Sequence, residues 1–192
     1  SKLFKRIFDI FLSLFLLILY SPILIIAMIL IKLTSKGPVF YKQERVGRNE
    51  KPYIMYKFRS MVQNAEEYGP EWAGEQDPRI TTVGKILRKM YIDEIPQLVN
   101  VLKNEMSIVG PRPERPFFVK KLKSEIPYYY KRLSVKPGIT GWAQIKHKYD
   151  SSLADVKEKL QYDFYYIENM SLKLDFKIMI NTIIVVLLMK GH

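Results

Sequence analysis

The sequence has no cysteine and only two histidines, His147 and His192. The absence of cysteine excludes disulfide bonds, thiolate metal sites and cysteine nucleophiles. A histidine-ligated zinc site or a Ser-His catalytic pair would have to depend on one of those two residues, and one of them is the last residue of the chain. We therefore expect any chemistry to come from carboxylates, hydroxyls, lysines and arginines.

Acidic residues are also few compared with basic ones. The chain has 19 Asp and Glu against 31 Lys and Arg, which gives a formal net charge of +12 at pH 7. Such a charge predicts a polyanionic partner. Composition alone does not show whether that partner is nucleic acid, anionic lipid or a phosphorylated substrate. The length of 192 residues allows one domain, or a small domain with a membrane element, and a hydrophobic content of 48% is too high for a disordered chain.

The apolar residues gather at the two ends of the chain. Residues 10–31 form a run of 22 without a charge, and about 20 are needed to cross a bilayer core. Ser21 and Pro22 fall in the middle of this run, where proline predicts a kink or a break. Lysine and arginine flank the run on both sides, which suits a segment that enters and leaves by one membrane face. A kinked spanning helix, a re-entrant hairpin and a buried helix all remain open, whereas a cleavable signal peptide fits poorly because the run is too long.

After Gly37 the sequence becomes mixed and charged, and its periodicity predicts an α/β (α+β) fold that is mostly helical with a small sheet. Two short strands around a Gly47-Arg48-Asn49 loop predict a hairpin. Asn104 is expected to end a helix in the left-handed conformation. The last segment is too short to span and is expected to lie in the membrane surface or against the core. Strands are expected at 39–41, 53–56 and 142–145, and helices at 83–90, 98–102, 116–133 with an interruption at Pro127, 153–169 and 172–189.

Asp93 and Glu94 are adjacent acids just before Pro96 and the helix that it opens. One interpretation is helix capping, since acids are favoured at helix N-termini. The other is a carboxylate pair that holds a divalent metal or attacks phosphorus, with Arg88 and Arg112 nearby in the sequence. A carboxylate nucleophile needs no histidine, which agrees with the composition.

The segment 110–116 carries three prolines and two arginines in seven residues. Its restricted backbone would hold the guanidinium groups ready for phosphate, although a structural loop with solvated arginines explains it equally well. Lys57, Arg59, Arg79 and Lys136 add cations beside turns and strand ends, and each of them alone is weak evidence of a site.

Five motifs together resemble the bacterial sugar transferase family, the monotopic polyprenyl-phosphate phosphoglycosyl transferases. The likeness runs from about Lys5 to about Thr182. The motifs are Tyr-Lys-Phe-Arg-Ser-Met at 56–61, Asp-Pro-Arg-Ile-Thr at 77–81, Tyr-Ile-Asp-Glu-Ile-Pro-Gln-Leu-Val-Asn-Val-Leu at 91–102, Met-Ser-Ile-Val-Gly-Pro-Arg-Pro at 106–113 and Lys-Pro-Gly-Ile-Thr-Gly-Trp-Ala-Gln at 136–144.

The resemblance implies that a sugar 1-phosphate passes from a UDP-sugar to polyprenyl (undecaprenyl) phosphate with release of UMP. It implies that Asp93 is the nucleophile and that Glu94, with Asp93, binds Mg²⁺. It also implies a monotopic enzyme on the cytoplasmic face of the bacterial inner membrane. The apolar N-terminus makes nucleic acid a poor partner, and an oligomer is compatible with the sequence. The implied substrate-binding residues are Lys57, Arg59, Arg79, Arg88, Pro111, Arg112, Lys136 and Gln144.

The family's N-terminal helix favours the re-entrant hairpin, broken at Ser21-Pro22. The expected domains are then a membrane helix, residues 1–36, and a catalytic body with membrane-surface helices, residues 37–192. Residues 114–119 resemble longer family members with an extra N-terminal membrane region, so we expect the chain to be the catalytic part of such a protein. Asn104, Thr82 and residues 145–148 depart from the usual pattern, and the last of these leaves the sugar unassigned.

Two other functions remain open at this point. A basic, non-catalytic membrane-surface protein would bind anionic lipid or a biosynthetic partner, in a manner that weakens with salt. A metal-dependent phosphohydrolase would release free phosphate or sugar phosphate without a lipid acceptor.

Overall fold

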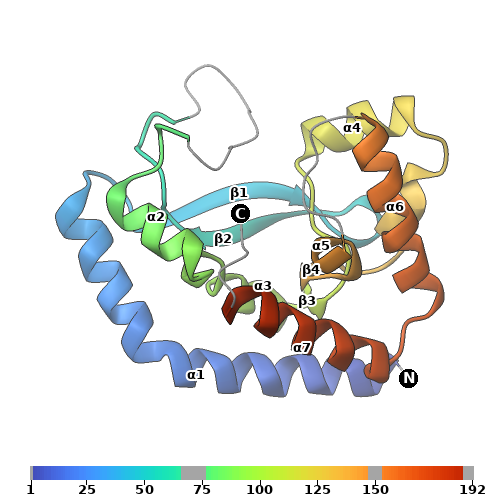
Figure 1. Ribbon diagram of the computed structural model, residues 1–192, viewed down its shortest axis with the longest axis horizontal. Coiled ribbons are helices and arrows are strands. Elements are labelled where there is room, and N and C mark those ends of the chain that lie inside the picture. Colours follow the sequence, from blue (N-terminus) through green and yellow to red (C-terminus); the bar gives the residue numbers. More distant parts are fainter. Residues whose placement is uncertain (1, 66–76, 147–152, 188–192) are drawn as a thin grey trace.

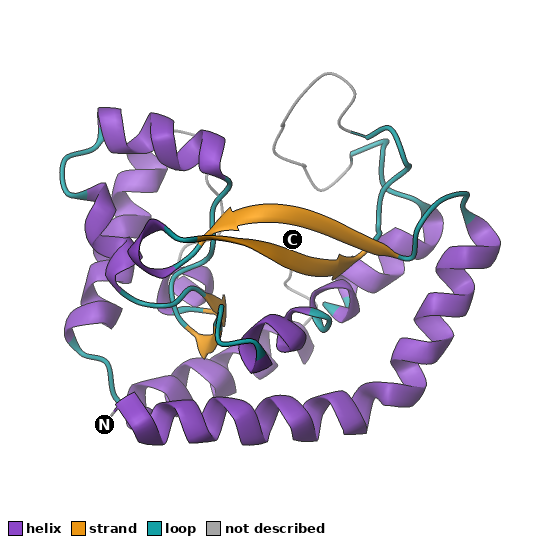
Figure 2. Ribbon diagram, turned by 180° about the vertical axis from the view of Figure 1, so that it is seen from behind, coloured by secondary structure: helices purple, strands orange, loops and turns teal. Residues whose placement is uncertain are grey.

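The computed structural model describes residues 2–65, 77–146 and 153–187. The fold is mostly helical with two small sheets, as the sequence predicts (Figure 2). The helices are α1 (Lys2–Thr34), α2 (Thr82–Lys89), α3 (Gln97–Leu102), α4 (Pro116–Glu125), α5 (Trp142–Lys146), α6 (Leu153–Glu168) and α7 (Leu172–Leu187), and the strands are β1 (Phe40–Val46), β2 (Pro52–Phe58), β3 (Ser107–Val109) and β4 (Gly138–Thr140).

The α1 helix is the element that shapes the molecule. It has 33 residues with Pro22 inside, and in the described part of the chain it is the one helix long and apolar enough to cross a membrane, by length and composition. It follows the bottom of the molecule and then turns upward (Figure 1). We attribute the bend to Pro22, which removes a backbone donor. The predicted break at Ser21-Pro22 is wrong as secondary structure, because the helix continues through both residues.

Both arms of α1 contact the rest of the protein. Near its start, Arg6 donates hydrogen bonds to the carbonyl oxygens of Val101 and Leu102 at the end of α3, at 2.6 and 3.0 Å. In its second arm, Ala27 and Ile31 are buried against a cluster that includes residues of β2 and α2. The two ends of the helix are therefore both attached to the same body.

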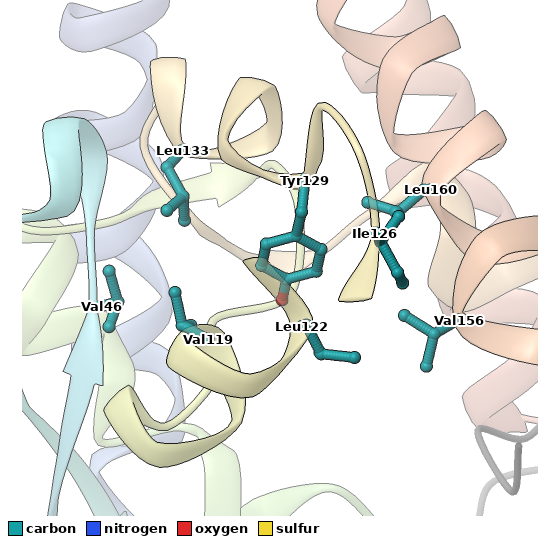
Figure 3. Close-up of a cluster of buried hydrophobic side chains, with 8 residues drawn as sticks. All are labelled: Val46, Val119, Leu122, Ile126, Tyr129, Leu133, Val156 and Leu160. Carbon is teal, nitrogen blue, oxygen red and sulfur yellow. The ribbon is translucent and has the colours of Figure 1, made fainter. Parts of the chain in front are cut away.

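The β1 and β2 strands form the predicted antiparallel hairpin, in a register that pairs Phe40 with Phe58 and Val46 with Pro52. The turn between them has Asn49 and Glu50 in the left-handed region, at φ of 55° and 62°. A separate buried cluster holds one end of this hairpin to α4, α6 and the segment 129–134 (Figure 3). The members of the cluster are Val46, Val119, Leu122, Ile126, Tyr129, Leu133, Val156 and Leu160.

Two local predictions are corrected. Residues 142–145 are helical rather than extended, and the strand is the preceding β4, which runs parallel to β3. Such a short apolar run does not distinguish strand from helix, and packing decides here, since Ala143 is fully buried and the ring of Trp142 stacks on Tyr165 of α6. The helix predicted at 83–90 ends one residue earlier, since α2 stops at Lys89, and it buries Leu87 but leaves Ile86 exposed.

The predicted end of α3 is confirmed, because Asn104 follows it in the left-handed region at φ 69°. The predicted helices at 153–169 and 172–189 correspond to α6 and α7, with residues 188 and 189 outside the described part of the chain. In α7, Ile178 is buried, whereas Phe176, Ile180, Ile183 and Ile184 are exposed. This helix thus lies against the core on one side and presents an apolar side away from it.

Candidate functional site

The acidic pair lies on a single 3₁₀ turn, η2 (Ile92–Glu94), between α2 and α3. Tyr91 precedes the turn in the left-handed conformation, at φ 54°, and so ends α2 before the acidic turn begins. The capping interpretation is wrong, because the N-cap of α3 is Pro96 and no side chain caps it. Asp93 is buried, with 7% of its surface exposed, so a carboxylate has been removed from water without serving as a cap.

Glu94 forms the ionic centre of the site. The Nζ atom of Lys57, on β2, lies 2.7 Å from Glu94 Oε1. The Nη2 atom of Arg112, in the loop after β3, lies 3.3 Å from the same oxygen. Two cations from distant parts of the sequence therefore share one carboxylate oxygen.

The surroundings separate the pKa values of the two acids. Burial and the repulsion of Glu94 raise the pKa of Asp93 to about 6, although Lys57, Arg88 and Arg112 act against this shift. Burial also raises the pKa of Glu94, but Lys57 and Arg112 outweigh it and lower that pKa to about 2. Glu94 is thus ionised near neutral pH, while Asp93 is the more basic carboxylate. Paired acids with separated pKa values are typical of sites in which each acid has its own role.

Arg88 is placed by the close approach of α2 to the end of β2. Its Nε donates to Ser60 Oγ at 2.8 Å. Gly84 permits this approach, since a Cβ atom at that position would lie 2.0 Å from the carbonyl oxygen of Ser60. The backbone N–H of Thr81 donates to the same carbonyl at 3.0 Å, and the Thr81 side chain caps α2.

Lys57 and the acidic turn are brought together by Asn100, which is fully buried on α3. Its Nδ2 donates to the carbonyl of Ile54 at 2.7 Å, and its Oδ1 accepts from the N–H of Tyr56 at 3.1 Å. These bonds fix α3 against β2. Since η2 leads directly into α3, they also fix the acids beside Lys57.

Buried charged side chains hold the loop that carries Arg112 in place. Arg132 donates to the carbonyl oxygen of Arg112 at 2.9 Å and is ion-paired with Asp163 at 2.9 Å. The carbonyl of Pro111 accepts from the N–H of Gly138 at 2.9 Å. Pro111 thus acts through the backbone of the loop, and the loop is tied to both β4 and the 3₁₀ segment 129–134.

The charged residues among the predicted site residues divide into two groups. The structure gathers Asp93, Glu94, Lys57, Arg88 and Arg112. Three other predicted cations are engaged by different groups: Arg59 donates to the carbonyls of Ser35 and Lys36 after α1, Arg79 pairs with Asp77, and Lys136 bonds Asn104. Their phosphate-binding roles stay predictions.

A sequence model of the family described as Bacterial sugar transferase matches residues 1–189. The chain belongs to the bacterial sugar transferase family.

Relatives of this sugar transferase are known in several bacteria. It is 48% identical over 179 residues to the UDP-N-acetylgalactosamine-undecaprenyl-phosphate N-acetylgalactosaminephosphotransferase of Aeromonas hydrophila, a match that covers 93% of this chain and 42% of the relative. It is 43% identical over 185 residues to the UDP-glucose:undecaprenyl-phosphate glucose-1-phosphate transferase of Klebsiella pneumoniae, covering 95% and 40%. It is 39% identical over 189 residues to the exopolysaccharide production protein PSS of Rhizobium leguminosarum, covering 94% and 93%. The chain thus spans less than half of the first two relatives.

The donor set of this sugar transferase fits Mg²⁺. The described residues contain no group of three or more His, Cys, Asp and Glu side chains that could hold a metal ion. Mg²⁺, however, is usually bound by one or two carboxylates together with waters and substrate phosphates. The adjacent carboxylates of Asp93 and Glu94 match that requirement, and Glu94 is ionised at neutral pH.

Beside the acidic pair, the sugar transferase has a pocket of about 170 Å³. Glu94, Arg112 and Gln144 line it together with apolar residues of α1 and α7, among them Leu16, Tyr20, Val185 and Val186. Gln144 donates to the carbonyl of Ile139 at 3.1 Å, and its Oε1 is buried without a hydrogen-bond partner. Gln144 is among the site residues predicted from the sequence, whereas the α1 and α7 residues are not, because apolar side chains in apolar helices carry no signal of a site.

Proposed function

We propose that this sugar transferase moves a sugar 1-phosphate from a UDP-sugar to polyprenyl phosphate, which is undecaprenyl phosphate in bacteria, and releases UMP. The observation that carries the proposal is the burial of Asp93 among Lys57, Arg88 and Arg112 beside an ionised Glu94. Three cations around two acids suit the binding of a diphosphate. A carboxylate of raised pKa suits nucleophilic attack, because nucleophilicity rises with basicity.

In the first step an oxygen of Asp93 attacks the sugar-bearing phosphorus of the UDP-sugar. The bond from that phosphorus to the bridging oxygen breaks, and UMP leaves with the electron pair. The product is a sugar phosphate joined to Asp93 as an acyl phosphate. In the second step an oxygen of polyprenyl phosphate attacks the same phosphorus, and Asp93 leaves as a carboxylate. No proton transfer is required, which agrees with the described residues of the site, none of which is a histidine.

The cations of the site stabilise the charge that moves during these steps. Arg88 and Arg112 are suited to hold the phosphate oxygens, and Lys57 is suited to stabilise the leaving UMP or to keep Glu94 ionised. Mg²⁺ bound at Asp93 and Glu94 would neutralise phosphate charge and align the diphosphate. The relatives from Aeromonas hydrophila and Klebsiella pneumoniae, whose names include undecaprenyl phosphate, support undecaprenyl phosphate as the acceptor.

We propose that α1 enters and leaves the membrane by its cytoplasmic face, which makes the protein monotopic in the inner membrane. The support is that both arms of α1 contact one body, through Arg6 at one end and Ile31 at the other. A straight crossing would carry one end to the opposite face. Between the two contacts the helix exposes large apolar side chains, among them Phe11, Phe15, Ile18, Ile23 and Ile26.

The reaction is tested by assaying UMP release from a panel of UDP-sugars, with and without undecaprenyl phosphate. The wild-type protein should release at most one equivalent of UMP per protein without acceptor and further UMP in proportion to added acceptor, and Asp93→Asn should release none. Free phosphate or sugar phosphate made without acceptor would indicate a phosphohydrolase instead. No turnover with any donor, together with salt-sensitive binding to anionic vesicles, would indicate a non-catalytic lipid-binding protein.

A further inference from the structure

The pocket beside Glu94 joins a polar end to an apolar wall. Glu94 and Arg112 line the polar end, and Leu16 of α1 and Val185 and Val186 of α7 contribute to the apolar wall. The Arg112 side chain is 34% exposed and lines the pocket, so it can meet a phosphate there besides its contact with Glu94. The pocket therefore offers a cation at one end and hydrocarbon side chains at the other.

Two helices with exposed apolar side chains, α1 and α7, contribute to that apolar wall. At their starts α1 and α7 are joined by the ion pair of Lys5 and Asp175 at 2.7 Å and by the rings of Phe8 and Phe176 at 5.1 Å. From there the two helices run in the same general direction (Figure 1). Leu16 lies eleven residues, or about 16 Å, beyond Lys5 on α1, and Val186 lies equally far beyond Asp175 on α7. Both side chains line the pocket. The wall thus lies along helices whose outer sides are apolar and exposed.

The chemistry of this wall favours a hydrocarbon chain over a nucleotide. A base and a ribose need several hydrogen-bond partners, and burying them without such partners is costly. The hydroxyl that α7 brings to the pocket, Thr182 Oγ1, is already bonded to Thr140 Oγ1 at 2.6 Å and to the carbonyl of Ile178 at 2.8 Å. A volume of about 170 Å³ is also below the ~300–1,000 Å³ of pockets that enclose a whole drug-sized ligand.

We propose that this pocket binds the first isoprene units of the polyprenyl phosphate acceptor and holds its phosphate against Arg112. The inference rests on the proposed function and assigns the acceptor to particular residues. The acceptor enters from the membrane between α1 and α7, with its phosphate leading, and the rest of its chain stays among the lipids. The phosphate then arrives at Glu94, which adjoins Asp93, the carrier of the sugar phosphate, on the acidic turn.

Filling the pocket tests the assignment, because the first half-reaction needs no lipid. Leu16→Trp and Val186→Trp add bulk to the wall. Ile18→Trp and Ile183→Trp are matched controls on the same helices, at positions 74% and 57% exposed. The two pocket variants should raise the KM for undecaprenyl phosphate by about tenfold or more and leave adduct formation from the UDP-sugar unchanged, and the controls should change neither.

Two results would overturn the assignment. An increase in the KM for the UDP-sugar would mean that the pocket serves the donor, and a wild-type KM for acceptor in both pocket variants would mean that the chain lies elsewhere. A wild-type protein that forms no adduct would instead refute the proposed function.

A measurement free of turnover tests in either case whether the pocket binds the acceptor. Asp93→Asn protein is photolabelled with a polyprenyl phosphate that carries a diazirine in its first isoprene units, and the label should map to α1 and α7 near Leu16 and Val186. Labelling confined to other segments would contradict the proposal.

Discussion

Lys57 Nζ lies 2.7 Å from Glu94 Oε1, in an ion pair that joins β2 to the acidic turn. Arg112 reaches the same oxygen at 3.3 Å. Both cations are directed at Glu94, while burial, together with the repulsion of Glu94, raises the pKa of Asp93. These charges separate the pKa values of the two acids. That separation is the electrostatic basis for the roles that we propose, with Asp93 as nucleophile and Glu94 as metal ligand.

The first prediction concerns pH. Adduct formation requires ionised Asp93, whose pKa burial and Glu94 raise to about 6 in the protein without metal. Its rate should therefore fall at acidic pH, to about one-tenth of its plateau one unit below the midpoint of the acid limb. Lys57 lowers the pKa of Asp93 and Glu94 raises it. The acid limb should therefore move to higher pH in Lys57→Met and to lower pH in Glu94→Gln. Single-turnover rates across a pH series at fixed Mg²⁺ measure both shifts, and a limb that moves the same way in both variants would contradict the assignment.

The second prediction concerns the metal. Chelation of Mg²⁺ should abolish UMP release, and Glu94→Gln should raise the Mg²⁺ concentration needed for half-maximal release by about tenfold or more, because a neutral amide replaces an anionic ligand. Glu44→Gln is the control, since Glu44 is exposed on β1. Isothermal titration of Mg²⁺ in the presence of a UDP-sugar provides a reading of binding that is independent of turnover. Equal Mg²⁺ affinity in wild type and Glu94→Gln would rule Glu94 out as a ligand.

The third prediction concerns the approach of α2. In Gly84→Ala the new Cβ would lie 2.0 Å from the carbonyl of Ser60, so α2 must move away and take Arg88 with it. We expect a loss of about 1–3 kcal/mol in the free energy of unfolding and a larger KM for the UDP-sugar. Lys85→Ala, one residue later and exposed, is the control. Thermal unfolding and donor titration test the pair, and a Gly84→Ala protein with wild-type values of both would show that α2 adjusts freely.

The fourth prediction concerns topology and exploits the absence of cysteine. Single cysteines at Lys2 and Lys36, both exposed, flank α1 and give clean labelling sites. A membrane-impermeant maleimide should modify both of them in inside-out inner-membrane vesicles and neither in intact spheroplasts. Modification of the two positions from opposite faces would establish a spanning helix in place of the re-entrant one.

Local patterns predicted much of the fold. The hairpin of β1 and β2, the end of α3 at Asn104 and the helices α6 and α7 follow from periodicity and turn residues. The short segment at Trp142 is helical where a strand is predicted. Four residues carry too little periodicity to distinguish the two, and packing against α6 decides the outcome. The continuity of α1 through Pro22 could not be predicted from local sequence. A proline predicts the loss of one backbone hydrogen bond, but not how the neighbouring turns adjust to that loss.

The candidate site was predictable where charge is concentrated in a motif. Asp93, Glu94 and Arg112 could be found in this way, and the structure brings them together. The partnership of Lys57 with Glu94 depends on tertiary contacts that Asn100 secures, and the engagement of Arg59 by Ser35 and Lys36 depends on the end of α1. Neither contact can be read from spacing in the sequence.

The central claim is that Asp93 forms a covalent bond to the sugar phosphate. Protein incubated with UDP-sugar and Mg²⁺ but no acceptor should gain the mass of one sugar phosphate, and fragmentation of the labelled peptide should place it on Asp93. Addition of undecaprenyl phosphate should remove that mass, and Asp93→Asn should never acquire it. Turnover by wild-type protein with no adduct detectable on rapid quenching, or an adduct on another residue, would contradict the claim.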